Sequence, residues 1–274
     1  MQQTKLLTGA FNHLGKCRHG FMLYNINDVY IGRSFDLYGE FSEGEVELFD
    51  QIVRVGDVVL DVGANIGAHT LALAQKVGPT GRVYAFEPQR MVFQTLCANM
   101  ALNSIANTYC HQTALGEEAG SVVVPALNYA QANNFGGVEL GTFASGESVP
   151  VSTLDSLDLP ACRLVKIDVE GMEGNVLKGA VQTVKRLKPI LYVENDRVEK
   201  SIPLMQLIES LGYEMYWHLP PLYHPQNFYR NPQNVFGNIV SANLLCVHRE
   251  LGMKITGFKQ ALSGERHPFA PQPG

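Results

Sequence analysis

The sequence lacks long apolar runs, an excess of positive charge and paired-cysteine motifs. No stretch approaches the roughly 18 apolar residues of a membrane span, and the first ten residues lack the charged-then-apolar order of a signal peptide. Lys and Arg number 21 against 26 Asp and Glu, a formal net charge of −5 that argues against nucleic acid as a partner. None of the five cysteines forms a C-x-x-C pair, so we expect reduced thiols. These absences predict a cytoplasmic protein with neither a membrane nor a nucleic-acid partner.

The G-x-G-x-x-G motif of dinucleotide-binding proteins is also missing, although a similar turn follows an apolar strand predicted at residues 58–62. Asp61 stands near the end of that strand, and Gly63, Asn65 and Gly67 lie in the turn before a helix. A dinucleotide rests its pyrophosphate on the helix N-terminus, where Asp61 would repel it. The same carboxylate would attract the sulfonium and ammonium groups of S-adenosylmethionine. The turn therefore favours S-adenosylmethionine as the cofactor.

A second strand tip supports a nucleoside ligand. Glu87 follows the apolar residues 83–86 and stands 87 − 67 = 20 residues after Gly67. A carboxylate there can accept both ribose hydroxyls, and Pro88 can begin the next helix because its missing N–H has no partner in the first turn. Both cofactor classes use this ribose contact, so Glu87 indicates a nucleoside without identifying it.

Four motifs in order carry a family resemblance. Residues 61–67 (DVGANIG), 86–88 (FEP), 166–173 (KIDVEGME) and 177–180 (LKGA) resemble the FkbM family of S-adenosylmethionine-dependent methyltransferases, over a region from about residue 56 to residue 195. The resemblance implies a Rossmann-like class I methyltransferase fold and methylation of hydroxyls on natural products or sugars. It does not specify the acceptor.

The pattern along the chain is that of an α/β protein. Strands alternate with helices from residue 58 onward, which predicts a mostly parallel sheet with right-handed crossovers and flanking helices. The clearest helix is residues 174–188, which ends before a proline. We predict seven strands, at residues 58–62, 82–87, 108–115, 164–168, 190–194, 213–217 and 243–247.

Three further regions surround the predicted methyltransferase domain of residues 56–250. An N-terminal extension, residues 1–55, contains a predicted β-hairpin at 20–38 and a helix at 40–53. Residues 126–150 are rich in Gly, Asn and Ser, a composition that predicts an inserted lid, binding loop or disordered segment. The tail, residues 251–274, contains several prolines and is expected to be loosely attached.

Candidate catalytic residues cluster after the strand predicted at 164–168. Asp168 is expected to contact the acceptor hydroxyl or the cofactor ammonium, with Glu170 or Glu173 as a general base. The structural alternative is that both glutamates stabilise the N-terminus of the next helix. Residues 217–240 combine aromatic, imidazole and amide groups typical of an acceptor wall, and His224 in this segment is another candidate base.

Asp168, Glu194 and Asn195 resemble the acid, acid, amide metal site of catechol O-methyltransferases. Three oxygen ligands could hold Mg²⁺ or Ca²⁺ and lower the pKa of the acceptor hydroxyl. The chain departs from that family because Gly171 occupies the position where a catalytic lysine is expected. In the alternative interpretation, Glu194 and Asn195 hydrogen-bond the following loop.

Further cofactor contacts are expected at the edges of this region. Ala114 and Leu115 would lie beside the adenine, and Tyr38 and Glu45 would close over the methionine moiety. The function predicted is S-adenosylmethionine-dependent O-methylation of a small metabolite, sugar or glycan. A nicotinamide-dependent oxidoreductase and a catalytically inert S-adenosylmethionine-binding module are the alternatives, and homo-oligomerisation is left open.

Overall fold

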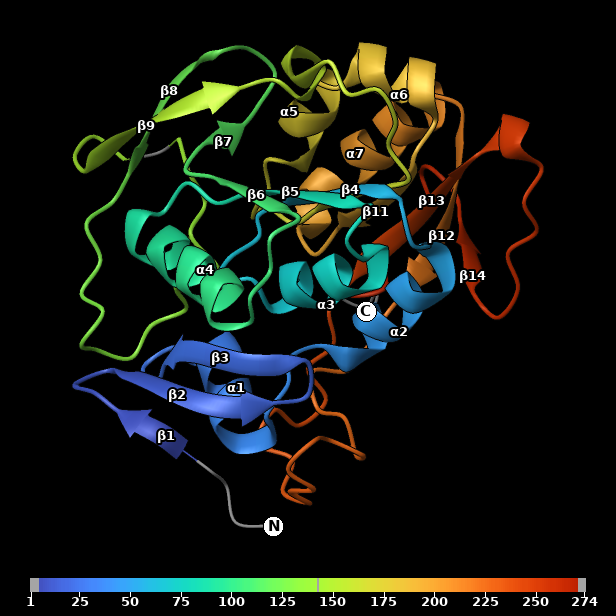
Figure 1. The fold of residues 1–274 in the computed structure, drawn as a ribbon. Helices are drawn as coiled ribbons and strands as arrows, with labels where there is room; N and C mark the ends of the chain where they lie inside the picture. Colours follow the sequence, from blue (N-terminus) through green and yellow to red (C-terminus); the bar gives the residue numbers. More distant parts are fainter. Residues whose placement is uncertain (1–4, 142, 271–274) are drawn as a thin grey trace.

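The computed structural model describes residues 5–141 and 143–270, which form a central eight-stranded sheet covered by helices on both faces (Figure 1). The strand order is β14-β12-β13-β11-β10-β4-β5-β6. Neighbours from β11 to β6 are parallel, whereas β13 pairs antiparallel with both β11 and β12. The seven predicted strands are all present in this sheet. The strands are β4 (Val58–Val62), β5 (Arg82–Phe86), β6 (Thr108–His111), β10 (Leu164–Ile167), β11 (Ile190–Glu194), β12 (Tyr213–His218), β13 (Asn243–His248) and β14 (Lys259–Ala261).

Helices α2, α3 and α4 lie on one face of the sheet, and α5, α6 and α7 lie on the other (Figure 1). Alternate residues of β4 explain how both faces are covered, since Val59 packs with Leu73 of α3 while Leu60 packs with Val176 of α5. This doubly wound arrangement brings the carboxyl ends of β4, β5, β10 and β11 to one edge. The helices are α2 (Glu43–Ile52), α3 (Ala68–Val77), α4 (Arg90–Leu102), α5 (Glu173–Lys178), α6 (Val181–Leu187) and α7 (Val198–Ser210).

The N-terminal extension differs from the prediction. Its hairpin is formed by β2 (Asn12–Cys17) and β3 (Gly20–Asn25), with β1 (Lys5–Thr8) added at the edge, and residues 31–38 form helix α1 (Ile31–Tyr38). The hairpin prediction for residues 20–38 is therefore wrong in its second half. Buried Phe35 and Tyr38 share one face of α1, a helical spacing that the turn residues before it obscured. Residues 1–4 lie outside the described chain.

A small second sheet follows β6. The strand predicted at 108–115 is interrupted, because β7 (Ala114–Leu115) leaves the main sheet and pairs with β9 (Glu147–Ser152), which in turn pairs with β8 (Gly120–Val124). The segment predicted as a loop at 126–150 thus includes the start of β9, and Thr142 within it lies outside the described residues.

The helix predicted at 174–188 is broken into α5 and α6. The carboxylate of Asp155, in the 3₁₀ turn η1 (Leu154–Leu157), accepts hydrogen bonds from the backbone N–H groups of Gln182 and Thr183. These groups are unsatisfied donors of a helix N-terminus, so Asp155 stabilises a new start at α6. The apolar spacing predicted the helical faces correctly but not this interruption.

Most of the described tail is attached, which corrects the expectation for residues 251–274. After the 3₁₀ turn η2 (Arg249–Leu251), β14 pairs with β12, and His267 Nε2 lies 2.6 Å from the carbonyl oxygen of Asn195. The prolines at 271 and 273 fall outside the described residues. Within the part of the chain that the structure describes, no helix combines the length and hydropathy needed to span a membrane.

Candidate active site

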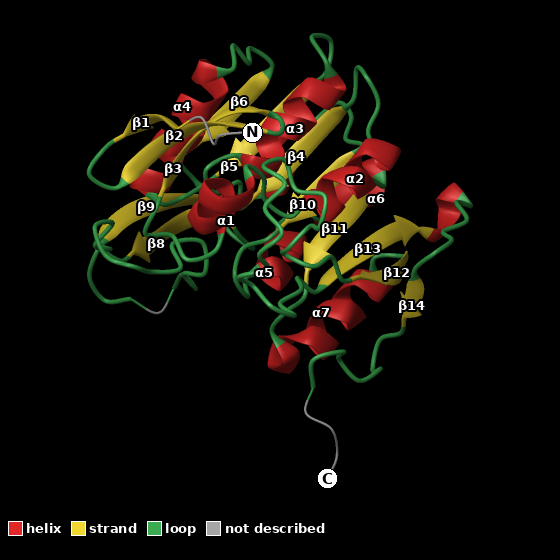
Figure 2. Ribbon diagram, turned by 90° about the horizontal axis from the view of Figure 1, so that it is seen from below, coloured by secondary structure: helices red, strands yellow, loops and turns green. Residues whose placement is uncertain are grey.

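A cavity of about 380 Å³ lies at the carboxyl ends of the parallel strands. Figure 2 shows loops crossing this edge between α1 and α5. The cavity has a predicted cofactor end, beside β4, β5 and β7, and a predicted acceptor end, beside β10 and β11. Ten predicted site residues line it: Glu45, Gly63, Asn65, Glu87, Pro88, Ala114, Leu115, Asp168, Glu170 and Glu194. Six do not: Tyr38, Asp61, Gly67, Glu173, Asn195 and His224.

Glu87 organises the cofactor end. Its Oε2 accepts a hydrogen bond from Asn65 N (3.0 Å), and its Oε1 accepts one from Gln89 N (2.8 Å). Burial raises the pKa of Glu87 to about 7, although these two bonds favour the charged form. The carboxylate thus fixes the glycine-containing turn while keeping lone pairs for a ligand in the cavity.

The glycines of the turn serve close packing within the protein. Gly63 has φ +80°, and a Cβ atom there would lie 1.7 Å from the carbonyl oxygen of Asp168. At Gly67, with φ +88°, a Cβ would lie 2.7 Å from Leu96 Cδ1 of α4. Gly63 is therefore required by the close approach of the backbone after β10, and Gly67 by its left-handed φ.

Asp61 faces a buried lysine instead of the cavity. Lys166 Nζ lies 3.2 Å from Asp61 Oδ1 and 3.3 Å from Asp168 Oδ2, and it donates a hydrogen bond to Gly63 O. Thr70 Oγ1 donates to Asp61 Oδ2 (2.6 Å). Burial acts to lower the pKa of Lys166, but Asp61 and Asp168 outweigh it and the pKa is raised. The predicted contact of Asp61 with the sulfonium and ammonium is corrected, because its carboxylate neutralises Lys166.

Glu45 and His69 line the cavity from α2 and α3. His69 Nε2 lies 3.6 Å from Glu45 Oε2, and Ser42 Oγ donates to Glu45 Oε1 (2.8 Å). Burial raises the pKa of Glu45 to about 7 and lowers the pKa of His69 to about 4. His69 is therefore neutral at physiological pH, and its Nε2 has no hydrogen-bond partner among the described residues.

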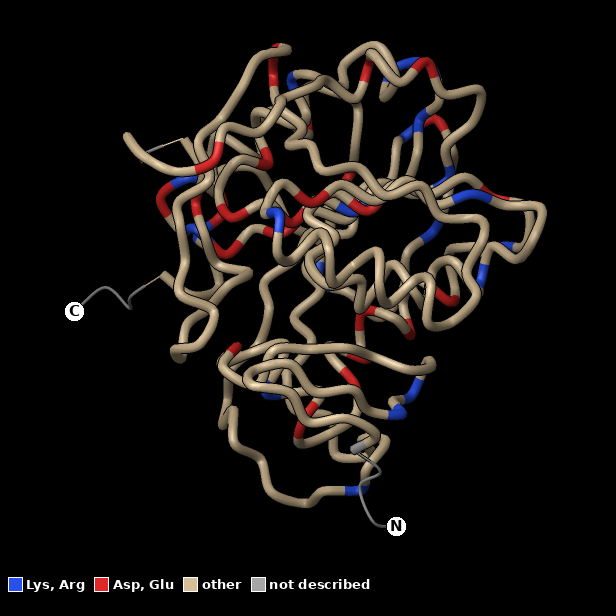
Figure 3. The backbone as a smooth tube through the Cα atoms, turned by 60° about the vertical axis from the view of Figure 1, so that its left-hand side comes forward, with Lys and Arg blue, Asp and Glu red and all other residues tan. Residues whose placement is uncertain are grey.

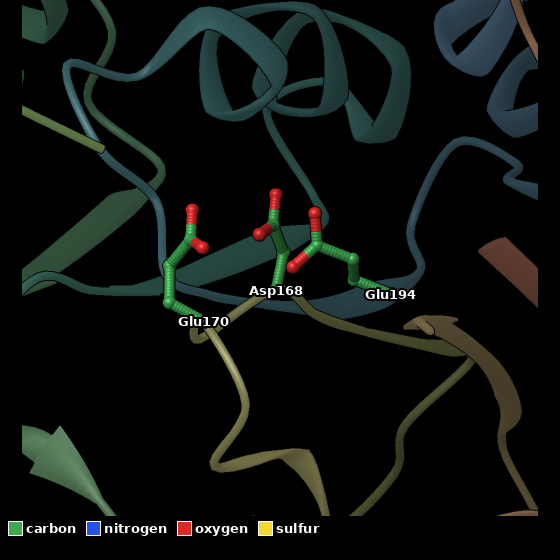
Figure 4. Close-up of side chains that lie close together, drawn as sticks. All are labelled: Asp168, Glu170 and Glu194. Carbon is green, nitrogen blue, oxygen red and sulfur yellow. The ribbon is translucent and has the colours of Figure 1, made fainter. Parts of the chain in front are cut away.

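Three carboxyl groups meet at the acceptor end. Figure 4 shows Asp168, Glu170 and Glu194 directed to the same side of the strand ends, where one oxygen of each lies within 4.8 Å of the others. Burial and the nearby Asp168 charge raise the pKa of both glutamates. Arg197 Nη2 donates to Glu170 Oε2 (2.6 Å) and supplies a counter-charge. The side chain of Asp168 is 35% exposed, against 18% for that of Glu170.

Two residues predicted for this end have structural roles. Glu173 Oε1 accepts hydrogen bonds from the backbone N–H groups of Val169 and Gly171, so it holds the turn before α5. Asn195 Nδ2 donates to Ser201 Oγ (2.9 Å), and Asn195 does not line the cavity. Glu173 as a base and Asn195 as a metal ligand are therefore corrected, in line with the structural alternatives.

His224 and Tyr38 belong to a network that attaches the N-terminal extension to residues 217–240. Glu40 accepts hydrogen bonds from Arg18 Nε (2.6 Å) and Phe228 N (2.7 Å), and its Oε1 lies 2.9 Å from His224 Nδ1. Tyr38 donates its hydroxyl to a backbone carbonyl of the same segment. Neither residue lines the cavity, so the predicted base and the predicted methionine contact are corrected to packing roles.

The loop at 126–150 does reach the cavity. Asn134, Gly136, Val138 and Leu140 line it, and Gln89 Nε2 donates to the carbonyl oxygen of a neighbouring loop residue (2.7 Å). A second contact joins Glu139 to Lys200 of α7. These contacts bring the loop to the cavity, and its role as a lid or binding loop stays a prediction.

Residues 217–240 reach the cavity with aliphatic side chains. Leu222, Ile239 and Val240 line the acceptor end. The aromatic residues turn elsewhere: Trp217 packs in the core beneath α7, and the Tyr223 ring packs on Tyr38 at 5.3 Å. The predicted aromatic wall is therefore wrong, because these rings attach the segment to the rest of the protein.

The polar lining residues that sequence reasoning missed include Lys166, His69, Gln89 and Arg197. Lys166 had a detectable signal, since a charge in the middle of an apolar strand requires a buried partner. Gln89 directly follows the Glu87-Pro88 pair. His69 and Arg197 carry no local signal, because their roles depend on Glu45 and Glu170 from distant elements.

The placement of charged residues agrees with the excess of acidic over basic residues in the sequence. Figure 3 shows Lys and Arg in several separate segments of the described chain, interspersed with Asp and Glu. Acidic residues from β10, the β11 tip and the residues that follow it converge on the cavity, where Asp196 joins Asp168, Glu170 and Glu194.

Comparison with known proteins identifies the family to which the chain belongs. The family model described as the methyltransferase FkbM domain matches residues 61–215. The chain belongs to the FkbM methyltransferase family. This membership and the sheet order confirm the predicted family and the Rossmann-like class I methyltransferase fold, with β14 as an additional strand. They also set aside the nicotinamide-dependent alternative.

This FkbM family member is similar to two named methyltransferases and to one protein of known crystal structure. It is 26% identical over 187 residues to hexuronic acid methyltransferase AglP of Haloferax volcanii, covering 62% of this chain and 68% of AglP. It is 29% identical over 143 residues to Methyltransferase 1 of Beauveria bassiana, covering 44% of this chain and 57% of that protein. A crystal structure of methyltransferase FkbM from Methylobacillus flagellatus KT superimposes with a TM-score of 0.46 and 18% identity, covering 74% of this chain and 50% of that one.

Proposed function

We propose that the protein transfers a methyl group from S-adenosylmethionine to a hydroxyl of a small metabolite, sugar or glycan. The observation that carries the proposal is that Glu87 and Asp168, from separate family motifs, line one cavity. The name of AglP, a hexuronic acid methyltransferase, supports a sugar among the acceptor classes.

The cofactor end fits a nucleoside. Gln89 Oε1 is buried without a hydrogen-bond partner among the described residues, and Gln89 lines the cavity beside Ala114 and Leu115. An unpartnered buried carbonyl oxygen calls for a ligand donor, which the amino group of adenine would supply. Glu87 would accept the ribose hydroxyls, and Glu45 would hold the ammonium group.

Asp168 is the residue we assign to the acceptor proton. When bound, S-adenosylmethionine supplies an electrophilic methyl group: its S–CH₃ bond breaks, the electron pair stays on sulfur, and a C–O bond forms. Asp168 would accept the hydroxyl proton and release it to solvent, since its side chain keeps 35% of its surface exposed. Lys166, 3.3 Å from Asp168 Oδ2, holds this carboxylate in place.

Metal-assisted transfer is the second candidate mechanism. The observation that favours it is the close approach of Asp168, Glu170 and Glu194, which replaces the set predicted with Asn195. Oxygen ligands of this kind suit Mg²⁺ or Ca²⁺, which would lower the pKa of the acceptor hydroxyl. Arg197 already supplies positive charge to Glu170, so we favour transfer without a required divalent ion.

Binding of the reaction product tests the proposal directly. S-adenosylhomocysteine should raise the melting temperature because a ligand that binds only the folded state stabilises it. NAD should have no effect. Binding of NAD with no response to S-adenosylhomocysteine would overturn the proposal, and product binding without turnover of any acceptor would identify an inert binding module.

A further inference from the structure

The inserted loop is firmly attached where it reaches the cavity. Val29 N donates to Asn133 O (3.0 Å), and Asn133 N donates to Asn27 O (3.0 Å). Two residues later, the Phe135 side chain is 3% exposed, and the Phe135 carbonyl oxygen accepts a hydrogen bond from Gln89 Nε2 (2.7 Å). Backbone pairing and burial therefore hold this part of the loop to the N-terminal extension and to the residue before α4.

Residues 133–140, which we call the strap, continue along the cavity. Every second residue from Asn134 to Leu140 lines the cavity. This period of two is typical of an extended chain, in which successive side chains point to opposite sides. Glu139 is one of the intervening residues and does not line the cavity. A ligand that fills the cavity would contact the strap along its length.

An ion pair holds the other end of the strap. Glu139 Oε1 pairs with Lys200 Nζ, and the two side chains are 44% and 41% exposed. The same Nζ donates to the carbonyl oxygen of Gly171 (3.1 Å), in the turn that carries Glu170. Ion pairs with this exposure add little to stability, so this attachment can break while the one at Asn133 holds.

We propose that the Glu139–Lys200 pair is a latch that opens and closes the strap over the cavity. When the pair breaks, the strap stays attached at Asn133 and admits or releases the cofactor. When the pair forms, Lys200 joins the strap to the turn of Glu170. The inference rests on the proposed function, because it assigns the latch to exchange of the cofactor product. A latch slows ligand entry and exit equally, whereas a residue that contacts the ligand slows mainly its exit.

Stopped-flow kinetics of S-adenosylhomocysteine binding test the latch. Lys200→Met and Glu139→Gln should each raise both the association and the dissociation rate constant by about two- to fivefold, the factor expected for loss of an exposed ion pair. The dissociation constant should stay within about twofold, because both rate constants rise together. The double variant should be no faster than Lys200→Met alone, since both substitutions break the same contact.

Lys178→Met is the matched control. Lys178 Nζ lies 3.1 Å from Glu117 Oε2, the two side chains are 47% and 51% exposed, and neither residue lines the cavity. This variant should leave both rate constants unchanged. A rise in the dissociation rate alone, unchanged rates in the strap variants, or an equal effect of the control would overturn the latch. Failure of the unmodified protein to bind S-adenosylhomocysteine would instead refute the proposed function, and with it the assignment of the latch to cofactor exchange.

Discussion

The cofactor end and the acceptor end of the cavity are assembled in different ways. At the cofactor end, Glu87 binds backbone N–H groups at residues 65 and 89, both close to it in the fold and within 22 positions in sequence. At the acceptor end, Asp168 and Glu170 meet Glu194 of the neighbouring strand tip, Arg197 of α7 and aliphatic residues of two separate loops. A compact motif can specify a nucleoside site, whereas acceptor specificity depends on segments that can vary independently.

The largest effect should come from the acceptor end. Asp168→Asn removes the proposed proton acceptor while keeping its shape, so the transfer rate should fall by roughly 10²–10⁴-fold. The affinity for S-adenosylhomocysteine should change by no more than about threefold, since the ribose and adenine contacts are elsewhere. Rates are measured as S-adenosylhomocysteine formed with an acceptor found by screening sugars and hydroxylated metabolites. A variant that retains full activity would exclude Asp168 as the base.

A smaller effect is expected at the cofactor end, where a substitution should weaken the binding of the cofactor product instead of slowing methyl transfer. Glu87→Ala should weaken S-adenosylhomocysteine binding by about 1.5–3 kcal/mol, the scale of hydrogen bonds to a charged group. Calorimetric titration measures this change, and circular dichroism checks that the fold is kept. Unchanged affinity would remove Glu87 from the cofactor site and with it the division between the two ends.

The pH dependence of S-adenosylhomocysteine binding tests the assignment of Glu87 to the cofactor end. Burial raises the pKa of Glu87 from 4.5 to about 7, and ribose hydroxyls donate best to the ionised form. S-adenosylhomocysteine should therefore bind about tenfold more tightly at pH 8 than at pH 6, because a carboxyl group with a pKa of about 7 is roughly one-tenth ionised at pH 6 and nine-tenths ionised at pH 8. Glu87→Gln should reduce this dependence. A pH-independent affinity in the unmodified protein would contradict the assignment.

Raised carboxyl pKa values also predict how the stability of the unliganded protein changes with pH. Burial raises the folded-state pKa values of Glu45 and Glu87 above their unfolded value of 4.5, so the folded state binds more protons between about pH 4.5 and 7. Their contribution to stability is present below that range and is lost as pH rises through about 7. Denaturant titrations of the Glu87→Gln variant should show a weaker decline with rising pH than those of the unmodified protein.

The smallest effect is expected from metal removal. Because Arg197 already balances Glu170, transfer should persist after treatment with a chelator, and cofactor-product affinity should not change. Loss of transfer that added Mg²⁺ or Ca²⁺ restores would favour the metal-assisted mechanism through Asp168, Glu170 and Glu194 instead.

The sequence predicted the central sheet well because its strands are buried and carry continuous apolar runs. The limits of β4 and β11 match the prediction at both ends. The strand predicted at 108–115 is an exception, because β7 leaves the main sheet and joins a second one. Helix α1 was missed because turn residues precede it and its partners in the core are not local.

Side-chain direction at the site was harder to predict than position. The strand tips brought Glu87, Asp168 and Glu194 together as expected, since parallel strands end at one edge. The role of Asp61 could not be read locally, because Lys166 lies on another strand, in register with it. For His224, the deciding partner was Glu40, which is 184 residues away in the chain.

The bonds between the N-terminal extension and residues 217–240 also bear on how the chain matures as it is synthesised. Tyr38 donates to a carbonyl oxygen 195 residues later in the chain. At ribosomal rates of about 5–20 residues per second, that partner emerges roughly 10–40 s after Tyr38 does. The packing of the N-terminal extension is thus completed only after residues 217–240 have been synthesised. Until then, Tyr38 lacks the backbone partner that it has in the folded protein.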